Sequence, residues 1–377
     1  MTGKKSGRKH GTVGLWGSSM AALLCGMASA PLAAQQATPA SPQCTVNSIN
    51  VVCTGALPNG FEVPTADRDI YTRLTLRNLT APINASAPDG VAIDFFNDAQ
   101  PVSVTIDTPD TLITSQGASY PRGNFIVGSS SAVGVRARTR SNVSIVSNAD
   151  ITIDADTIDY GAVELVAGLA ADMIQTGTAT RDLTLRNSGD ITITSNESPN
   201  SFTNQIAGIW AGYSGLEGLT PAPPRGIRLG TGVIENIGSI TVERGAGIMT
   251  SDLDYGTLDV LNSGTITASG PNGDVFAYGI NIEAGAASNF GGNRYQTTTV
   301  RNTGTITVED RGATAIGISL EKNVGPRFDN RDSSPGTVVN DGRIIQANIE
   351  GLDFGTGIRI EQGVSLTTGN GAVANMP

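Results

Sequence analysis

The chain has 377 residues and a formal net charge of −10, with 15% charged residues and 47 glycines. Ile, Val and Leu recur throughout the polar background, which excludes a disordered chain, and the many β-branched residues favour an all-β fold. An acidic chain is a poor electrostatic partner for nucleic acid, so we expect no nucleic-acid partner.

Residues 1–34 predict a secretory signal peptide. The basic stretch "KKSGRK" precedes the weakly apolar "GLWGSSMAALLCGMASA" and the small residues of "APLAAQQ", an order typical of such peptides. We place the cleavage after Ala34, because cleavage after Ala30 would leave Pro31 first. A short membrane anchor is the alternative, although the apolar run is short for one. Without the four basic residues of this segment, 20 Lys and Arg face 34 Asp and Glu, a net charge of −14.

Residues 35–66 are predicted to form an N-terminal cap. Within it, Cys44 and Cys53 flank the strand-like sequence "TVNSINVV". In an exported protein this spacing fits a β-hairpin whose ends are joined by a disulfide. Two free thiols are the alternative.

An internal repeat occupies most of the remaining chain. The motif is Asn-x-Gly followed by alternating apolar and polar residues, and its copies begin at Asn187, Asn236, Asn262, Asn302 and Asn340. Two degenerate copies place Asp107 and Ser147 in the same frame, and the spacings are 40, 40, 49, 26, 40 and 38 residues. A fixed unit therefore carries insertions of variable length. The 26-residue unit, from Asn236 to Asn262, contains three short β patterns separated by Gly-rich or Asp-rich corners.

Three short strands per unit predict a right-handed parallel β-helix over residues 67–377, with about eight three-stranded rungs counted from residue 70. Each strand is expected to pair with its equivalent one rung away, at the ordinary inter-strand spacing of about 4.8 Å. Ile and Val at alternate positions should point inward, whereas Thr192, Thr267 and Thr307 should face outward. An antiparallel sandwich or a propeller would not explain why the same corner recurs.

The Asn-x-Gly motif is predicted to be a turn between two strands, because Asn and Gly tolerate left-handed backbone conformations. In a stacked solenoid, the amides of Asn187, Asn236, Asn262, Asn302 and Asn340 are expected to form a hydrogen-bonded corner ladder. An Asn-lined ligand groove is the alternative.

The insertions are predicted to leave one edge of the solenoid, because most follow the "G-I-x-I" type strand. They occupy residues 167–181, 211–231, 284–297 and 322–336. Arg and aromatic residues are common at binding hot spots, and loops on a rigid scaffold often carry function. The candidate contact residues are Tyr213, Arg225, Phe290, Arg294, Tyr295, Arg327 and Phe328. Solvated insertions folded onto the flank are the alternative.

Catalytic and cofactor sites are not expected. The only histidine is His10, within the signal peptide, which excludes a Ser-His-Asp or Cys-His triad and most zinc sites in the mature chain. Four carboxylates lie close together in "DITIDADTID", at Asp150, Asp154, Asp156 and Asp159. They could hold calcium or act on a polysaccharide, but a solvated rim is the more common arrangement.

An exported chain with a cysteine-closed start, followed by degenerate "V-x-N-x-G-x-I-x-V" rungs, resembles the passenger region of autotransporters (type V secretion). The resemblance covers roughly residues 44–377. It implies export through the inner membrane, periplasm and outer membrane to the cell surface or medium, with an outer-membrane translocator barrel as partner. This chain stops at "GNGAVANMP" without a barrel signature. We therefore expect the barrel to lie in a missing C-terminal part or in a separate protein.

These features together predict a non-enzymatic adhesin or stalk whose inserted loops contact glycans or other cell surfaces. The lack of a mature histidine argues against the protease subgroup of the family. Two other classes remain open, namely a secreted β-helical polysaccharide lyase or hydrolase that uses carboxylates, and a structural surface-layer component.

Overall fold

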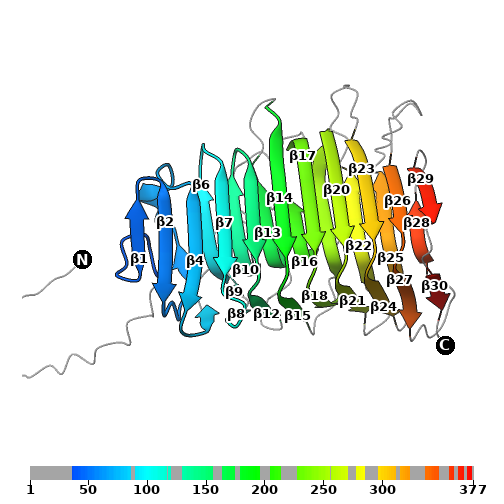
Figure 1. Cartoon of the computed structure of the whole chain (residues 1–377), viewed down its shortest axis with the longest axis horizontal. Coiled ribbons are helices and arrows are strands. Elements are labelled where there is room, and N and C mark those ends of the chain that lie inside the picture. The colour runs from blue at the N-terminus through cyan, green and yellow to red at the C-terminus, as the bar shows by residue number, and fades with distance from the viewer. Residues whose placement is uncertain are drawn as a thin grey trace, which may run out of the picture. The chain divides into compact units, whose positions relative to one another are not determined.

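The chain divides into two units, residues 1–34 and 35–377, and the fold described here is that of the second. A computed structural model describes residues 36–85, 90–116, 118–119, 130–155, 164–174, 179–195, 204–213, 227–254, 256–270, 277–284, 296–310, 315–322, 336–347, 356–360, 364–368 and 372–375. Its strands stack side by side in chain order, from blue to red in Figure 1.

Each rung contributes one strand to each of three sheets. The first sheet contains β1 (Cys44–Asn47), β2 (Asn50–Gly55), β4 (Arg73–Leu79), β7 (Val102–Asp107), β11 (Val143–Ser147), β14 (Arg181–Asn187), β17 (Ile227–Asn236), β20 (Gly256–Asn262), β23 (Gln296–Asn302), β26 (Gly336–Asn340) and β29 (Val364–Thr368). The second sheet contains β5 (Ile83–Ala85), β8 (Leu112–Gln116), β12 (Asp150–Asp154), β15 (Asp190–Thr194), β18 (Ser239–Glu243), β21 (Thr265–Gly270), β24 (Thr305–Asp310), β27 (Arg343–Ala347) and β30 (Ala372–Asn375).

The third sheet contains β3 (Phe61–Glu62), β6 (Val91–Asn97), β9 (Ala118–Ser119), β10 (Ser130–Thr139), β13 (Glu164–Met173), β16 (Asn204–Gly212), β19 (Ala246–Asp254), β22 (Ala277–Ala284), β25 (Ala315–Lys322) and β28 (Thr356–Ile360). A 3-10 helix, η1 (Thr65–Asp67), precedes β4. The first and third sheets join where β17 pairs with β19.

Strand pairing makes the molecule a parallel β-helix. Equivalent strands of successive rungs pair in parallel and in register; for example, Ile191 of β15 faces Ile240 of β18. Antiparallel pairing occurs only in β1–β2 and β9–β10 among the described strands. Eight complete rungs run from β4 to β28, followed by β29 and β30. The all-β solenoid with about eight rungs is confirmed.

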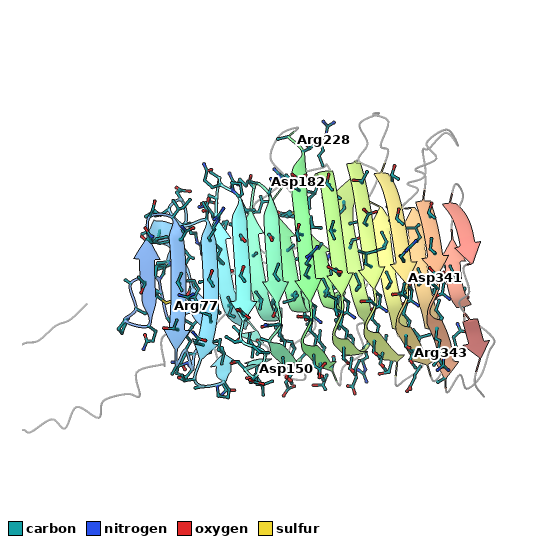
Figure 2. All side chains as sticks on the ribbon, viewed as in Figure 1. Arg77, Asp150, Asp182, Arg228, Asp341 and Arg343 are labelled. Carbon is teal, nitrogen blue, oxygen red and sulfur yellow. A yellow bond between two sulfur atoms is a disulfide. The ribbon has the colours of Figure 1, made fainter. Side chains whose placement is uncertain are left out.

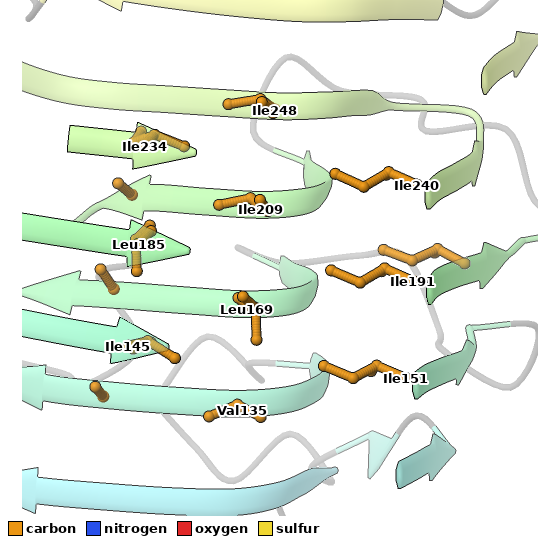
Figure 3. Packing of buried hydrophobic residues seen from close by; sticks show 14 of the residues in the cluster. Val135, Ile145, Ile151, Leu169, Leu185, Ile191, Ile209, Ile234, Ile240 and Ile248 are labelled. Carbon is orange, nitrogen blue, oxygen red and sulfur yellow. The ribbon is translucent and has the colours of Figure 1, made fainter. Parts of the chain in front are cut away.

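The core consists of columns of aliphatic side chains, one from each sheet. Figure 3 shows Ile151, Ile191 and Ile240 of the second sheet stacked above one another and facing the columns of the other two sheets. All three side chains are at most 1% exposed. Alternation in "DITID" and "DITIT" places every second residue inside, because successive side chains of a strand point to opposite faces.

A glycine column lets the third sheet approach the second. It consists of Gly134, Gly168, Gly208, Gly247, Gly279 and Gly317. A Cβ atom at any of them would lie only 2.2–2.5 Å from the Cγ2 atom of a second-sheet isoleucine. The glycine of the "G-I-x-I" pattern is therefore a packing requirement, which sequence periodicity alone did not reveal.

The N-terminal hairpin carries the predicted disulfide. Cys44 of β1 pairs with Cys53 of β2 in an antiparallel register, and the two sulfur atoms are bonded. On its other side, β2 pairs in parallel with β4 of the first complete rung. The hairpin thus continues the first sheet and is held closed covalently.

Candidate functional site

The Asn-x-Gly corners form one continuous column between the first and second sheets. The side chains of Asn187, Asn236, Asn262, Asn302 and Asn340 are at most 2% exposed. Each of the first four donates a hydrogen bond from Nδ2 to Oδ1 of the next asparagine, at 2.8–3.0 Å. The same Nδ2 also donates to the carbonyl of the glycine two residues later. The column joins the rungs and offers no open ligand groove among these side chains.

The physical reason for glycine at these corners differs from the one expected. Positive φ angles occur at Ser48, Asn78, Arg244 and four glycines, none of which belongs to the repeated corner. The expectation of left-handed corners is therefore wrong. A Cβ atom at Gly264 would lie 2.0 Å from the carbonyl oxygen of Gly238, one rung away. Successive corners stack so closely that only hydrogen fits between them.

The corner column begins at Ser147, and Asp107 does not belong to it. Ser147 is paired with Asn187 on one side and with Ile106 on the other. Ile106 therefore occupies the position that the repeat alignment assigned to Asp107, and the alignment was shifted by one residue in that rung. Asp107 instead accepts a hydrogen bond from Asn148. Because serine replaces asparagine, the Oδ1 atom of Asn187 is buried without a hydrogen-bond partner.

Replacing Asn262 by leucine tests the energetic contribution of the column. The change removes the donor to Asn302 Oδ1 and the acceptor of Asn236 Nδ2. A buried polar group left without a partner costs about 1–3 kcal/mol, so we expect the free energy of unfolding to fall by about that amount. Urea titration followed by circular dichroism measures it. The control Asp341→Ala lies at an exposed corner position, and an equal effect there would contradict the assignment.

One predicted contact residue lies within the described structure. Tyr213 directly follows β16, where it is half-buried and packs against the core. The remaining six lie outside the described residues: Arg225, Phe290, Arg294, Tyr295, Arg327 and Phe328. The structure thus shows Tyr213 as part of the solenoid wall as well as the start of a connection.

The predicted insertion at residues 167–181 begins too early. Residues up to Met173 belong to β13 and pair with β10, and those up to Asp172 pair also with β16, because Leu169, Ala171 and Met173 are buried in the core. Connections of variable length also separate the second and third sheets, for example residues 155–163 and 195–203. Insertions therefore occur at two of the three corners.

The carboxylates of "DITIDADTID" do not form a metal site in the described structure. Asp150 and Asp154 occupy alternate positions on the outer face of β12, and Figure 2 shows Asp150 at the lower edge of the view, beside the second sheet. Asp156 and Asp159 lie outside the described residues. Across the described ranges, no group of three His, Cys, Asp or Glu is placed to hold a metal ion.

A buried charge cluster, defined by Asp94, Arg136, Arg138 and Asp172, lies on the outer face of the third sheet. Arg136 donates to Asp94 from Nε at 3.0 Å and from a terminal nitrogen at 2.7 Å. Arg138 donates from Nε to Asp172 at 3.0 Å. The side chains of all four are at most 8% exposed. Arg138 also lies 5.3 Å from the ring centre of Phe96.

Electrostatics in the cluster favour the charged form of Asp94. Burial alone would raise the pKa of the Asp94 carboxyl, but Arg136, Arg138 and Arg68 together hold this pKa below its ordinary value. Bidentate Arg–carboxylate pairs are among the strongest hydrogen-bonded contacts in proteins. Sequence analysis missed this cluster; the one available signal was Asp94 within the apolar run "VAIDFFN".

The outer face of the second sheet carries an array of hydroxyl groups. Thr152, Thr192, Thr241, Thr267 and Thr307 occupy equivalent positions on five successive strands. Ser and Thr residues adjoin them two positions along the strands. We define the hydroxyl array as the residues on β15, β18, β21 and β24: Thr192, Thr194, Ser239, Thr241, Thr265, Thr267, Ser269, Thr305 and Thr307.

A cavity of about 400 Å³ lies in the N-terminal cap, between residues 36–43 and 56–60. Its described lining includes Gln36, Thr38, Ser41, Gln43 and Asn59, and none of the described lining residues is charged. The cavity offers hydrogen bonds but no side chain for acid–base chemistry.

Fold and surfaces together define a β-solenoid of the parallel β-helix class. Comparison with family models, with curated proteins and with solved structures finds no match. In the described part of the chain, we find no helix with the length and apolar character needed to cross a membrane.

Proposed function

We propose that the chain is an exported, surface-exposed or released passenger of autotransporter type, in which the solenoid serves as a stalk and the inserted connections make adhesive contacts. The observation that supports this most directly is the alignment of the connections between the third and first sheets. Ala284 and Lys322, the last residues of β22 and β25, are paired neighbours. The connections 285–295 and 323–335 therefore follow strand ends that are neighbours in the third sheet.

The fold does not need these long connections. Between β19 and β20 the same corner is closed by a single residue, Tyr255. A long connection costs more closure entropy than a short one, and nothing in the solenoid core requires it. Residues 214–226, 285–295 and 323–335 are thus the segments best suited to contact a partner, which we propose to be glycans or other cell surfaces.

Export is supported by two features. Disulfides persist mainly in oxidising compartments, and the Cys44–Cys53 bond joins the hairpin at the N-terminal side of the solenoid. The signal-like sequence of residues 1–34 precedes it. We propose passage through the inner membrane and periplasm to the cell surface or medium, with an outer-membrane translocator barrel as the partner in export.

Exchange of one connection tests the adhesive role. Leu253 is paired with Ala284, and Gly256 with Gln296, so residues 285–295 can be replaced by Asp-Tyr, the two residues that lie between Leu253 and Gly256 in the sequence. We expect the thermal unfolding midpoint to change little, because no described core residue is removed, whereas binding to a glycan array and to cultured cells should fall to background.

The control for this exchange is Thr303→Ala, which alters an exposed position at the other corner and should leave binding unchanged. Adhesion that survives the exchange would contradict the loop assignment. Specific release of products from a polysaccharide panel would instead favour the carboxylate-dependent enzyme.

A further inference from the structure

The hydroxyl array of the second sheet is a two-dimensional lattice set by the fold. Rows across the strands repeat at the inter-strand spacing of roughly 4.7–4.9 Å, and residues two apart on one strand are separated by roughly 6.6–6.8 Å. In register pairing places Thr241, Thr267 and Thr307 in one row, and Ser239, Thr265 and Thr305 in the next. The spacings are therefore fixed by backbone hydrogen bonds.

Rigidity beneath the array keeps these spacings constant. Ile191, Ile240, Ile266 and Ile306 alternate with the outward hydroxyl residues and are at most 1% exposed. Threonine side chains are also stiff, because branching at Cβ restricts χ1. Little side-chain freedom would thus be lost when an ordered layer forms on this face.

The central hydroxyls are available for binding. Thr192, Thr241, Thr267 and Thr307 are half-buried, and among the described residues none of these hydroxyls takes part in a hydrogen bond within the protein. Their methyl and hydroxyl groups face solvent at regular intervals. Water molecules that bridge such groups can be held in defined positions.

The middle row and the adjoining row from Ser239 to Thr305 are uncharged, whereas in the third row Glu243 is paired with Ser269 and Ser269 with Glu309. Asp190, Glu243 and Glu309 lie on its outer rows, and Glu243 is turned back to accept a hydrogen bond from the Ser195 backbone at 3.3 Å. The first sheet has threonines in outward positions too, but there the row from Thr184 to Thr299 is interrupted by Val233 and Asp259. Strand preference for threonine alone therefore does not explain the unbroken row on the second sheet.

We propose that the hydroxyl array binds a crystal face of ice. The two uncharged rows of the array, like an ice face, present oxygen atoms at regular intervals. A polysaccharide surface fits less well, because the described strands of the second sheet contain no aromatic side chain on which a sugar ring could stack. Many weak contacts made at once by one rigid face sum to a large binding free energy. This activity is independent of the connections assigned to adhesion, because those connections leave the solenoid at the corner between the third and first sheets.

Thermal hysteresis and uptake into a growing ice hemisphere test the proposal on the chain from residue 35 onward. The unsubstituted protein should separate the melting and freezing temperatures and should concentrate in ice. The double variant Thr241→Lys/Thr267→Lys should lose both properties. The matched control Thr184→Lys/Thr299→Lys changes half-buried threonines of the first sheet and should retain both.

A second pair of substitutions guards against misfolding. Thr241→Ser/Thr267→Ser keeps the hydroxyls but removes the methyl groups and the χ1 restriction, and it should reduce hysteresis while circular dichroism stays unchanged. No hysteresis and no uptake of the unsubstituted protein would overturn the proposal. Equal losses from the first-sheet variant would also overturn it, as would selective binding to crystalline cellulose or chitin through this face without uptake into ice.

Discussion

Replacement of Gly264 by alanine is expected to lower the free energy of unfolding by about 3 kcal/mol or more, at or beyond the upper end of the range for overpacking. The new Cβ atom would lie 2.0 Å from the carbonyl oxygen of Gly238 and 2.5 Å from that of Ile237. Both obstacles are backbone atoms of the preceding rung, so no side-chain rotation can relieve the contact. Urea unfolding followed by circular dichroism measures the loss.

The matched control for this change is Ser263→Ala at the neighbouring corner position. Ser263 is exposed, and its hydroxyl makes only a long hydrogen bond of 3.5 Å to the Asn236 carbonyl. We expect the free energy of unfolding of this variant to lie within about 0.5 kcal/mol of that of the unsubstituted protein, as is usual for exposed substitutions. If Gly264→Ala were equally mild, the close stacking of the corners would be refuted.

Arg136→Met is expected to lower the free energy of unfolding by about 3–5 kcal/mol, because it leaves the Asp94 carboxylate buried without its principal partner. The comparison variant is Arg186→Met. Arg186 contacts Glu235 at 3.0 Å, but its side chain is 55% exposed, and exposed ion pairs contribute about 0–1 kcal/mol. Similar losses in the two variants would show that burial does not govern the energetics of the cluster.

At acid pH, the free energies of unfolding of Arg136→Met and of the unsubstituted protein should differ less than at neutral pH. The pKa of Asp94 is lowered in the folded state, so its stabilising effect is present above the ordinary pKa of about 3.9 and is lost as pH falls through the folded value. In the variant, burial without Arg136 raises the pKa of Asp94, and protonation relieves the unpaired charge. Urea titrations at neutral pH and near pH 3 give the two differences; a constant difference would contradict this account.

Local periodicity was sufficient to predict the architecture. Alternation around Ile191, Ile266 and Ile306, together with the recurring asparagine, defines three strands per turn, and the buried columns follow from that pattern. The spacing of Cys44 and Cys53 likewise predicted the disulfide between them, which the structure contains. These features depend on residues close together in the sequence.

Other features depend on register between rungs, which one sequence does not contain. The corner glycines were explained by backbone conformation, whereas their carbonyl neighbours come from another rung. Asp107 looked like a corner until pairing placed Ile106 opposite Ser147. Arg136 and Asp94 are 42 residues apart, and only the register of β6 and β10 brings them together.

The single-residue closure between β19 and β20 also bears on how the solenoid assembles. In the described structure, every parallel strand pair except β17–β19 joins strands of adjacent rungs, so order must begin with two neighbouring rungs and then spread. Loop closure costs least where the intervening chain is shortest, which is the stretch from Asn236 to Asn262, the smallest separation in the corner ladder. Folding should therefore nucleate near the middle of the chain and grow toward both ends. Each added rung finds a ready template in the exposed strands of the one before it.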